Sequence, residues 1–326
     1  MGRWKEAVAC FDKKLELVRG DNPIDPNLNS FRTITKVKIK HDIEQFRYLE
    51  NLGSNADQMG QLARTYVSLD QEIEWPKGDN TPVPLTDKQF DVIKDSYNRP
   101  LHLNKAPAVT GSALNADLDP GSITQEYMDN APGMTYFDNF LSPEALFSLR
   151  QFLLESTIWY EFKYSGGYLG AMLGDGMACP LLFQIAEELR QTFPNIMKDH
   201  RLYQLWAYKY DSQLSGINPH ADFAAVNVNF WITPDTANLN PKTGGLIVYK
   251  KEAPLDWSFS AYNQNEKRIR AYLAEHESGK MVVPYAENRV VLFNSNLFHE
   301  TDSFEFKPGY ENRRINVTML FGHRQD

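Results

Sequence analysis

The sequence is poor in cysteine, in long apolar runs and in clustered positive charge. Among its 326 residues only Cys10 and Cys179 are cysteines, without metal-type spacing, so we expect neither a disulfide framework nor a zinc–thiolate site. No stretch approaches the roughly 18 apolar residues of a membrane span, and residues 1–6 lack an apolar signal core, so we expect no membrane contact and a reducing, cytoplasmic location. A net charge of −8 without a basic run argues against a nucleic-acid partner. Small polar molecules and proteins remain as binding partners.

The first 75 residues are predicted to form a helical region. Residues 2–17 indicate one amphipathic helix, and two further apolar stripes predict helices over 39–69 with a break near Gly53. The first helix resembles the second helix of a tetratricopeptide repeat, which would make it a remnant of a longer array that binds a protein partner. An ordinary capping helix is the alternative. The repeat-like pattern is carried by Gly2, Trp4, Ala7, Phe11, Leu15 and Leu17.

Residues 76–133 are predicted to be an extended connection packed on the domain that follows, because they contain many turn-forming residues and no sustained periodicity. From residue 134 to 326 the pattern predicts helices and then many short strands. Ser142 and Pro143 start one helix, and a second covers 180–193. Strands are predicted at 135–137, 202–210, 226–232, 245–250, 281–284, 289–294 and 313–321. This order favours an α+β fold with a jelly-roll core buttressed by helices. A charged helix over 264–276 interrupts the strands and is expected on the surface or over a pocket mouth.

The segment His220-Ala221-Asp222 carries the first candidate metal ligands. In an extended chain, side chains two residues apart point to the same face, so the imidazole and the carboxylate can reach a common point. His299, which follows the apolar strand 79 residues after His220, is the third candidate. Two histidines and one carboxylate form the facial triad of non-haem iron oxygenases, with open coordination positions. The remaining histidines are predicted to be structural or solvated; they are His41, His102, His200, His276 and His323.

Arg314 starts the polar face of the last predicted strand. The side chains of Ile315 and Val317 alternate with those of Asn316 and Thr318, so one face is apolar and Arg314 shares the other. An arginine in a mostly buried strand needs an anionic partner, and a carboxylate bound by both guanidinium nitrogens is a natural one. Arg313 lies on the opposite face at the strand's start, where we expect it to be solvated.

The combination of His220-x-Asp222, a distant histidine and an arginine fifteen residues later resembles the 2-oxoglutarate-dependent dioxygenases of double-stranded β-helix fold. Within that superfamily, residues 134–323 resemble the prolyl-4-hydroxylase type. The further matching segments are Trp206, Tyr208 and Tyr210 before the metal motif, Trp231-Ile232-Thr233-Pro234, and Thr243-Gly244-Gly245 before Leu246.

This resemblance implies Fe(2+) held by His220, Asp222 and His299, 2-oxoglutarate anchored on Arg314, and O2 as oxidant, with ascorbate as an expected stimulant. The implied reaction hydroxylates an unactivated C–H bond and releases succinate and CO2. Related halogenases have a small residue in place of the carboxylate, so Asp222 favours hydroxylation.

Alternation along the strands selects further candidates. Tyr208 or Tyr210 is expected to donate to the co-substrate carboxylate, although core packing is the alternative. Asn229 and Thr318 are candidates to supplement Arg314, because a buried amide or hydroxyl must be hydrogen-bonded. The candidate substrate-pocket residues are Asn227, Trp231 and Trp206.

Three functional hypotheses remain open. The first is a prolyl-hydroxylase-like enzyme acting on a protein or peptide, for which the N-terminal helices would help to bind the partner. The second is a hydroxylase of a small molecule such as an amino acid or secondary metabolite, with a closed pocket under the insertion at 256–276. The third is a non-catalytic interaction module.

Overall fold

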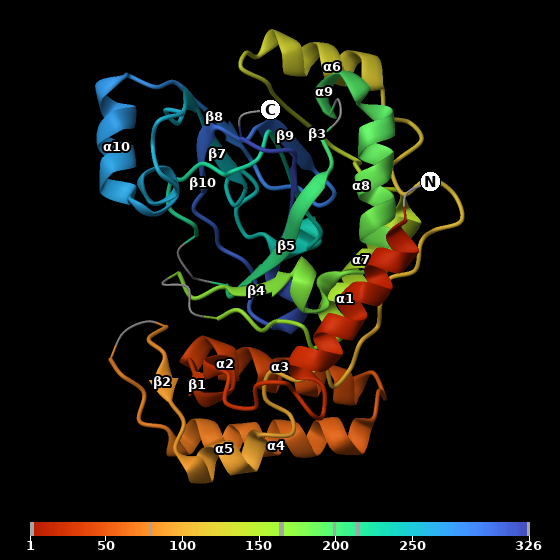
Figure 1. The fold of residues 1–326 in the computed structure, drawn as a ribbon, viewed down its shortest axis with the longest axis vertical. Helices are drawn as coiled ribbons and strands as arrows, with labels where there is room; N and C mark the ends of the chain where they lie inside the picture. Colours follow the sequence, from red (N-terminus) through yellow and green to blue (C-terminus); the bar gives the residue numbers. More distant parts are fainter. Residues whose placement is uncertain (1–2, 78–79, 163–165, 198–199, 213–215, 325–326) are drawn as a thin grey trace.

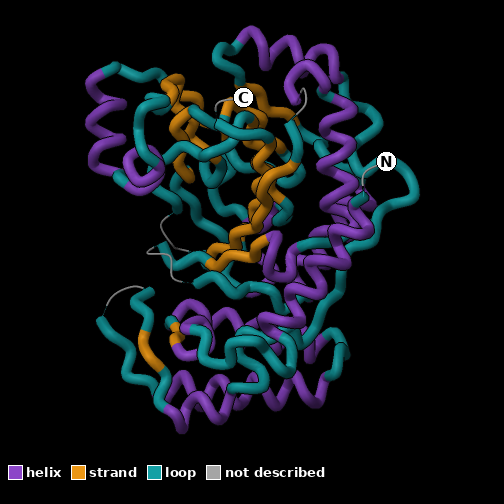
Figure 2. The backbone as a smooth tube through the Cα atoms, viewed as in Figure 1, coloured by secondary structure: helices purple, strands orange, loops and turns teal. Residues whose placement is uncertain are grey.

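The computed structural model describes residues 3–77, 80–162, 166–197, 200–212 and 216–324. Figure 1 shows a strand-rich core with helices along one side and a separate helical layer below it, and Figure 2 shows the strands gathered in the core. Among the described helices, none combines the length and apolar character needed to cross a bilayer.

The core is built on a six-stranded antiparallel sheet with the order β3-β9-β6-β11-β5-β4. Its strands are β3 (Met134–Phe137), β4 (Leu169–Met172), β5 (Leu202–Tyr210), β6 (Val226–Trp231), β9 (Val290–Asn294) and β11 (Arg314–Phe321). The chain returns to this sheet after each excursion to a smaller one, so most of its neighbouring strands are distant in sequence.

The smaller antiparallel sheet has the order β10-β7-β8. Its strands are β7 (Leu246–Glu252), β8 (Lys280–Val283) and β10 (Leu297–Thr301). An isolated antiparallel backbone pairing between His220 and His299 places the segment before β6 beside β10, at the edge of the smaller sheet. Chain segments thus alternate between two facing sheets, which is the jelly-roll arrangement of a double-stranded β-helix. The predicted fold class is confirmed.

The two faces of the large sheet differ in character. One face carries the apolar side chains of β11, which pack with α7 (Pro143–Glu155) and α8 (Pro180–Thr192). Ser142 caps α7 by accepting from the Ala145 amide at 3.3 Å, and Pro180 starts α8, as the sequence predicts. The other face turns Arg314, Asn316 and Thr318 into a cavity.

The N-terminal helices pack in two ways. The helix α1 (Trp4–Arg19) lies chiefly against the core, on α8 and on the irregular turn η1 (Leu173–Met177), with Arg19 paired to Asp175 at 2.5 Å. This is the arrangement that the capping-helix alternative predicts. The helices α3 (Lys36–Asn51) and α4 (Ala56–Glu72) pack on each other around their own apolar cluster, which agrees with the predicted break near Gly53.

Arg313 is not solvated, contrary to expectation. Only 2% of it is exposed, because α3 covers this face of the large sheet. Its Nε donates to Glu44 of α3 at 2.8 Å, and its Nη2 lies 3.7 Å from Asp211. The Gln45 amide also joins α3 to the core by donating to the carbonyls of Leu154 and Ser156.

Within the predicted connection over 76–133 the structure forms two helices, α5 (Asp87–Ile93) and α6 (Pro120–Asp129). Thr86 and Gln89 form a capping box at α5, and Asp119 caps α6, so local capping begins helices too short for periodicity to reveal. The remaining short elements are α2 (Asn29–Arg32), β1 (Thr33–Ile34), β2 (Val83–Pro84), α9 (Pro194–Met197), η2 (Asp235–Ala237) and η4 (Tyr310–Asn312). The division into domains at residues 75 and 133 stays a prediction.

The insertion between β7 and β8 contains the π-helical turn η3 (Ser260–Gln264) and the helix α10 (Glu266–Glu275), close to the predicted 264–276. Ile269 and Leu273 bury the apolar side of α10 in a cluster with Phe298 of β10. Arg270 pairs with Glu300 of β10 at 3.0 Å. The insertion therefore rests on the strand that carries His299.

Candidate metal centre and its cavity

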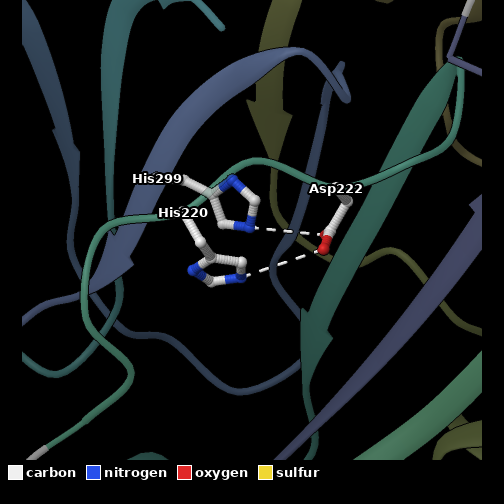
Figure 3. A group of neighbouring side chains, drawn as sticks. All are labelled: His220, Asp222 and His299. Carbon is white, nitrogen blue, oxygen red and sulfur yellow. Dashed lines mark ion pairs between the residues drawn. The ribbon is translucent and has the colours of Figure 1, made fainter. Parts of the chain in front are cut away.

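Backbone pairing brings the three candidate ligands together at one end of the jelly roll. The amides and carbonyls of His220 and His299 bond to each other at 3.0 and 2.8 Å, and the Asp222 amide donates to the Ser295 carbonyl at 3.1 Å. Figure 3 shows the side chains of His220, Asp222 and His299 converging from these segments.

The distances among the three side chains suit one small cation. Asp222 Oδ1 lies 3.9 Å from His220 Nε2, and Asp222 Oδ2 lies 3.5 Å from His299 Nε2. One ligand atom from each residue falls within 4.8 Å of the other two. Both imidazoles therefore present Nε2 toward the space that the carboxylate also faces.

Neighbouring groups fix the orientation of the ligands. Nδ1 of His220 lies 2.8 Å from the Asn218 carbonyl, and Nδ1 of His299 lies 3.1 Å from the Leu297 carbonyl. A carbonyl only accepts, so each Nδ1 carries the proton and each Nε2 keeps its lone pair. The Asn227 amide donates to Asp222 Oδ2 at 2.7 Å, which leaves Oδ1 without this bond. Such supporting bonds hold ligands in place for a metal.

Burial governs the charge of the ligands when no metal is bound. Burial, and then the charge of His220, lowers the pKa of His299 well below its ordinary value, so this imidazole is neutral and able to coordinate. Burial raises the pKa of Asp222, while His220 and the Asn227 amide act in the opposite direction. A cation between these groups would compensate the buried carboxylate.

The ligands open onto a cavity of about 370 Å³ between the two sheets. Arg314 lines the same cavity although only 2% of it is exposed. Its Nε donates to the Gly244 carbonyl at 2.7 Å, and its Nη1 lies 3.3 Å from Asn316 Oδ1. The guanidinium carbon of Arg314 lies over the Tyr210 ring, 4.9 Å from the centroid of that ring.

Arg314 forms no ion pair with any carboxylate among the residues that the structure describes. Burial lowers its pKa, and the nearby groups that favour its charge are Tyr210, Tyr285 and, less, Asp302. An arginine keeps its proton even when buried, so an unpaired guanidinium is costly. A carboxylate ligand in the cavity would supply the missing charge.

Polar groups continue along the floor of the cavity from Arg314. The Asn229 amide donates to the Thr318 hydroxyl at 3.0 Å, and the Asn316 amide lies 3.3 Å from Asn229 Oδ1. The Tyr210 hydroxyl is buried without a hydrogen bond of regular geometry among the described residues. These groups can bind the rest of an anionic, oxygen-rich ligand.

Nine of the eleven predicted site residues line this cavity, whereas two lie behind it. The lining residues are His220, Asp222, His299, Arg314, Tyr208, Tyr210, Asn229 and Thr318, with Trp206 on the wall. Asn227 is fully buried behind Asp222, where it supports the carboxylate instead of facing substrate. Trp231 is also fully buried and lies 5.8 Å from the Arg314 guanidinium.

Sequence reasoning missed part of the lining. Tyr168 and Met172 come from the edge of the sheet around β4, and Phe259 and Asn263 come from the insertion. Neither segment has an alternating pattern that would single out these positions. Strand alternation had already put Asn316 on the face of Arg314, and it could have added Gln204, which shares a strand face with Trp206. The other missed lining residues are Ile217, Phe223, Leu246 and Thr301.

The donor set fits Fe(2+). Two neutral imidazoles and one carboxylate form the facial set that non-haem iron uses, and this set leaves open positions for a co-substrate and O2. The three ligands and Arg314 line the same cavity. The residues present therefore suit both an iron ion and a dicarboxylate bound between the iron and Arg314.

No protein-family model and no curated protein matches the chain. Solved structures with a similar backbone include the non-haem α-ketoglutarate-dependent epimerase SnoN from nogalamycin biosynthesis, with 11% identity over 63% of this chain and 84% of that chain and a TM-score of 0.46. A Pseudomonas putida prolyl-4-hydroxylase shows 14% identity over 62% of this chain and 100% of that chain, with a TM-score of 0.38. AviO1 from Streptomyces viridochromogenes Tue57 shows 15% identity over 63% and 96%, with a TM-score of 0.41. At these identities and TM-scores the likenesses carry no functional argument, which rests on the side chains described above.

Proposed function

We propose that the chain is an Fe(II)- and 2-oxoglutarate-dependent dioxygenase that hydroxylates an unactivated C–H bond. The observation that carries this proposal is Arg314, a buried guanidinium without a carboxylate partner among the described residues, in the same cavity as the three ligands. A two-histidine, one-carboxylate site alone fits many metal enzymes. The dicarboxylate that Arg314 requires narrows the choice of co-substrate.

Each residue of the site would have its own role in binding the metal and the co-substrate. His220, Asp222 and His299 hold Fe(II), and the Asn218 and Leu297 carbonyls keep the imidazoles in the coordinating tautomer. Arg314 binds the far carboxylate of 2-oxoglutarate. Tyr210 adds a hydroxyl donor beside it, and Asn229 and Thr318 supply polar groups nearer the metal.

Iron bound here supplies the activation of O2 that is coupled to the oxidative decarboxylation of 2-oxoglutarate to succinate and CO2. The cavity walls would exclude bulk water from this reaction. They also hold the substrate C–H bond at the metal, so the choice of substrate depends on the walls more than on the three ligands.

The position of the insertion supports a small-molecule substrate over a protein or peptide. Phe259 and Asn263 of the insertion line the cavity beside His220, as a pocket under the 256–276 segment requires. The helix α1 packs on the core, so it gives no support to a repeat-type partner site. A peptide hydroxylase remains the competing version of the same chemistry.

Turnover of 2-oxoglutarate tests the function directly. Succinate formation should require Fe(II) and should be lost in His220→Ala and in Asp222→Ala, because each removes a metal ligand. His276→Ala is the matched control, since His276 is exposed at the end of α10. Calorimetric binding of 2-oxoglutarate to the Mn(II)-loaded protein gives a second readout without turnover. If the wild-type protein neither binds 2-oxoglutarate nor forms succinate, the interaction-module hypothesis replaces this one.

A further inference from the structure

The register of the strands orders the cavity from an inner to an outer end. Arg314 pairs with Tyr210, Asn316 with Tyr208 and Thr318 with Trp206. Thr318 lies four positions after Arg314, or about 13 Å further along the extended strand. The inner end is thus the anion site, and the part around Trp206 lies a long way from Arg314.

The outer cavity is defined here by Met172, Gln204, Trp206, Phe223, Phe259 and Asn263. None of these side chains carries a charge. Among the described residues that line the whole cavity, Asp222 and Arg314 are the only acidic or basic side chains apart from the two histidines, and both are committed to the metal and the co-substrate. An ionic substrate group buried in the outer cavity would therefore find no partner, which is costly.

Aromatic rings form a continuous path from the surface to the outer cavity. Tyr203 is 49% exposed and meets Phe223 edge to face at 5.4 Å, and Phe223 lies 6.3 Å from Phe259, which is 44% exposed. Trp206 belongs to the small apolar cluster against which Phe223 packs, and its ring lies 6.0 Å from Tyr208. Large apolar rings exposed together on a soluble surface indicate a binding site, and aromatic walls favour flat ring systems.

One polar group in this wall lacks a partner. Trp206 is 9% exposed, and its buried indole N–H donates to no group that the structure describes. Buried donors are almost always hydrogen-bonded. This indole nitrogen has almost no accessible surface, so a bound molecule would instead reach the Gln204 amide, which lines the cavity two residues further out on the same strand face.

We propose that the outer cavity binds an uncharged, flat, ring-containing small molecule that carries a hydrogen-bond acceptor such as a ketone oxygen. This substrate class rests on the proposed function, because the C–H bond to be oxidised must lie beside the metal. The occupant follows from three features: the uncharged walls, the aromatic path and the Gln204 amide in the cavity wall. The proposal does not include a peptide substrate, and binding of a peptide is one of the outcomes that would contradict it.

Binding of matched probes tests the substrate class without turnover. Ligand-observed NMR on the Mn(II)- and 2-oxoglutarate-loaded protein would compare 2-acetylnaphthalene, 2-ethylnaphthalene, 2-naphthoate and a proline-containing octapeptide. We expect 2-acetylnaphthalene to bind at least about tenfold more tightly than 2-naphthoate, whose charge would be buried unpaired. We expect it to exceed 2-ethylnaphthalene by about threefold to tenfold, the contribution of one neutral hydrogen bond.

Two variants test whether these differences in affinity depend on side chains of the outer cavity. Gln204→Leu keeps a side chain of similar size and removes the amide, so it should abolish the preference for 2-acetylnaphthalene over 2-ethylnaphthalene. Phe259→Asp should weaken 2-acetylnaphthalene binding about tenfold or more by placing a carboxylate at the cavity wall. Phe147→Asp is the matched control, since Phe147 is 63% exposed on α7 and outside the cavity. Melting temperatures verify that all three variants are folded.

The outcomes separate this inference from the proposed function. If 2-oxoglutarate binds but the peptide binds in place of the naphthalenes, the substrate class is wrong and the dioxygenase assignment stands. Equal binding of 2-acetylnaphthalene and 2-naphthoate also overturns the substrate class, as does an equal loss in Phe147→Asp. If 2-oxoglutarate itself fails to bind, the proposed function fails, and probe binding to the Mn(II)-loaded protein alone still decides what the wall recognises.

Discussion

Arg313 and Arg314 are neighbours in the chain and are equally buried, yet they lie on opposite faces of the large sheet. Each is 2% exposed. Arg313 meets Glu44 at 2.8 Å and Asp211 at 3.7 Å, whereas Arg314 meets carbonyls and an amide oxygen. One guanidinium has its counter-charge within the protein, and the other has it nowhere among the described residues.

The difference separates a structural arginine from a binding arginine. A buried pair that the chain supplies itself joins two elements, here α3 and the large sheet. A buried arginine without such a pair keeps its charge, so its local environment is complete only when an anion is bound. The pairing state of a buried cation is therefore more informative about function than its burial.

The largest expected effect is on 2-oxoglutarate binding. Arg314→Met should weaken binding roughly 30-fold to 1000-fold, because it removes one partner of a buried charge pair. Arg313→Met should leave this affinity within about twofold, since its partners lie on the other face. Calorimetric titration of both Mn(II)-loaded variants measures this. Equal losses would remove the distinction between the two arginines.

A smaller effect is expected on the metal. Asn227→Leu should weaken Mn(II) or Co(II) binding about 10-fold to 100-fold, because the amide bonded to Asp222 Oδ2 orients the carboxylate. Asn240→Leu, at an exposed position, is the control. The distinction between the residues of the site and Arg313 is strengthened if Asn227→Leu lowers the metal affinity and Arg313→Met does not. Unchanged metal affinity in Asn227→Leu would make Asn227 a packing residue.

The third expected effect is on stability. Arg313→Met should lower the free energy of unfolding by about 1–3 kcal/mol, which is less than for a fully buried pair because Glu44 is 24% exposed and partly screened by water. Arg314→Met should lower it less, because no internal carboxylate loses a partner. Urea unfolding measures both values, and a double-mutant cycle with Glu44→Gln isolates the pair. A coupling energy near zero would show that Arg313 and Glu44 do not hold α3 to the sheet.

Strand alternation was enough to place Arg314, Asn316 and Thr318 in one cavity, because the side-chain period of a strand is a local property. The same reasoning assigned Arg313 to the other face correctly but left it in solvent. Glu44 lies 269 residues away in sequence, and nothing local indicates that α3 covers this face.

The elements that the sequence did not predict also depend on contacts between segments that are distant in sequence. The strand β10 was not among the predicted strands, but it holds His299 in the small sheet through pairing with β7 and with the His220 segment. Phe259 and Asn263 come from a π-helical turn and its approach, for which the sequence has no periodic pattern. Local patterns therefore predicted the anion end of the site, while the substrate end depends on tertiary packing.

The last comparison concerns a third buried cation, Lys209, which lies beside Tyr210 on the same face as Arg313. Its Nζ donates to the Leu153 carbonyl at 3.0 Å and to the Tyr310 hydroxyl at 2.8 Å, with no carboxylate in contact among the described residues. Burial, and then the charge of Arg313, lowers the pKa of Lys209 well below its ordinary value. Lysine can thus escape an unpaired charge by losing its proton, which arginine cannot do.

This difference predicts how stability depends on pH. Between the lowered folded-state pKa of Lys209 and its ordinary unfolded value, the unfolded chain binds one more proton than the folded chain. The stability from this residue therefore rises with pH across that window, by up to about 1.4 kcal/mol per pH unit, and is lost as pH falls. Lys209→Met should flatten the rise in urea-unfolding free energy as the pH increases toward the ordinary pKa of lysine, and Arg314→Met should keep this rise. If the slope survives in Lys209→Met, this lysine is charged in the folded protein, and an unpaired buried cation on this sheet would no longer point to a ligand.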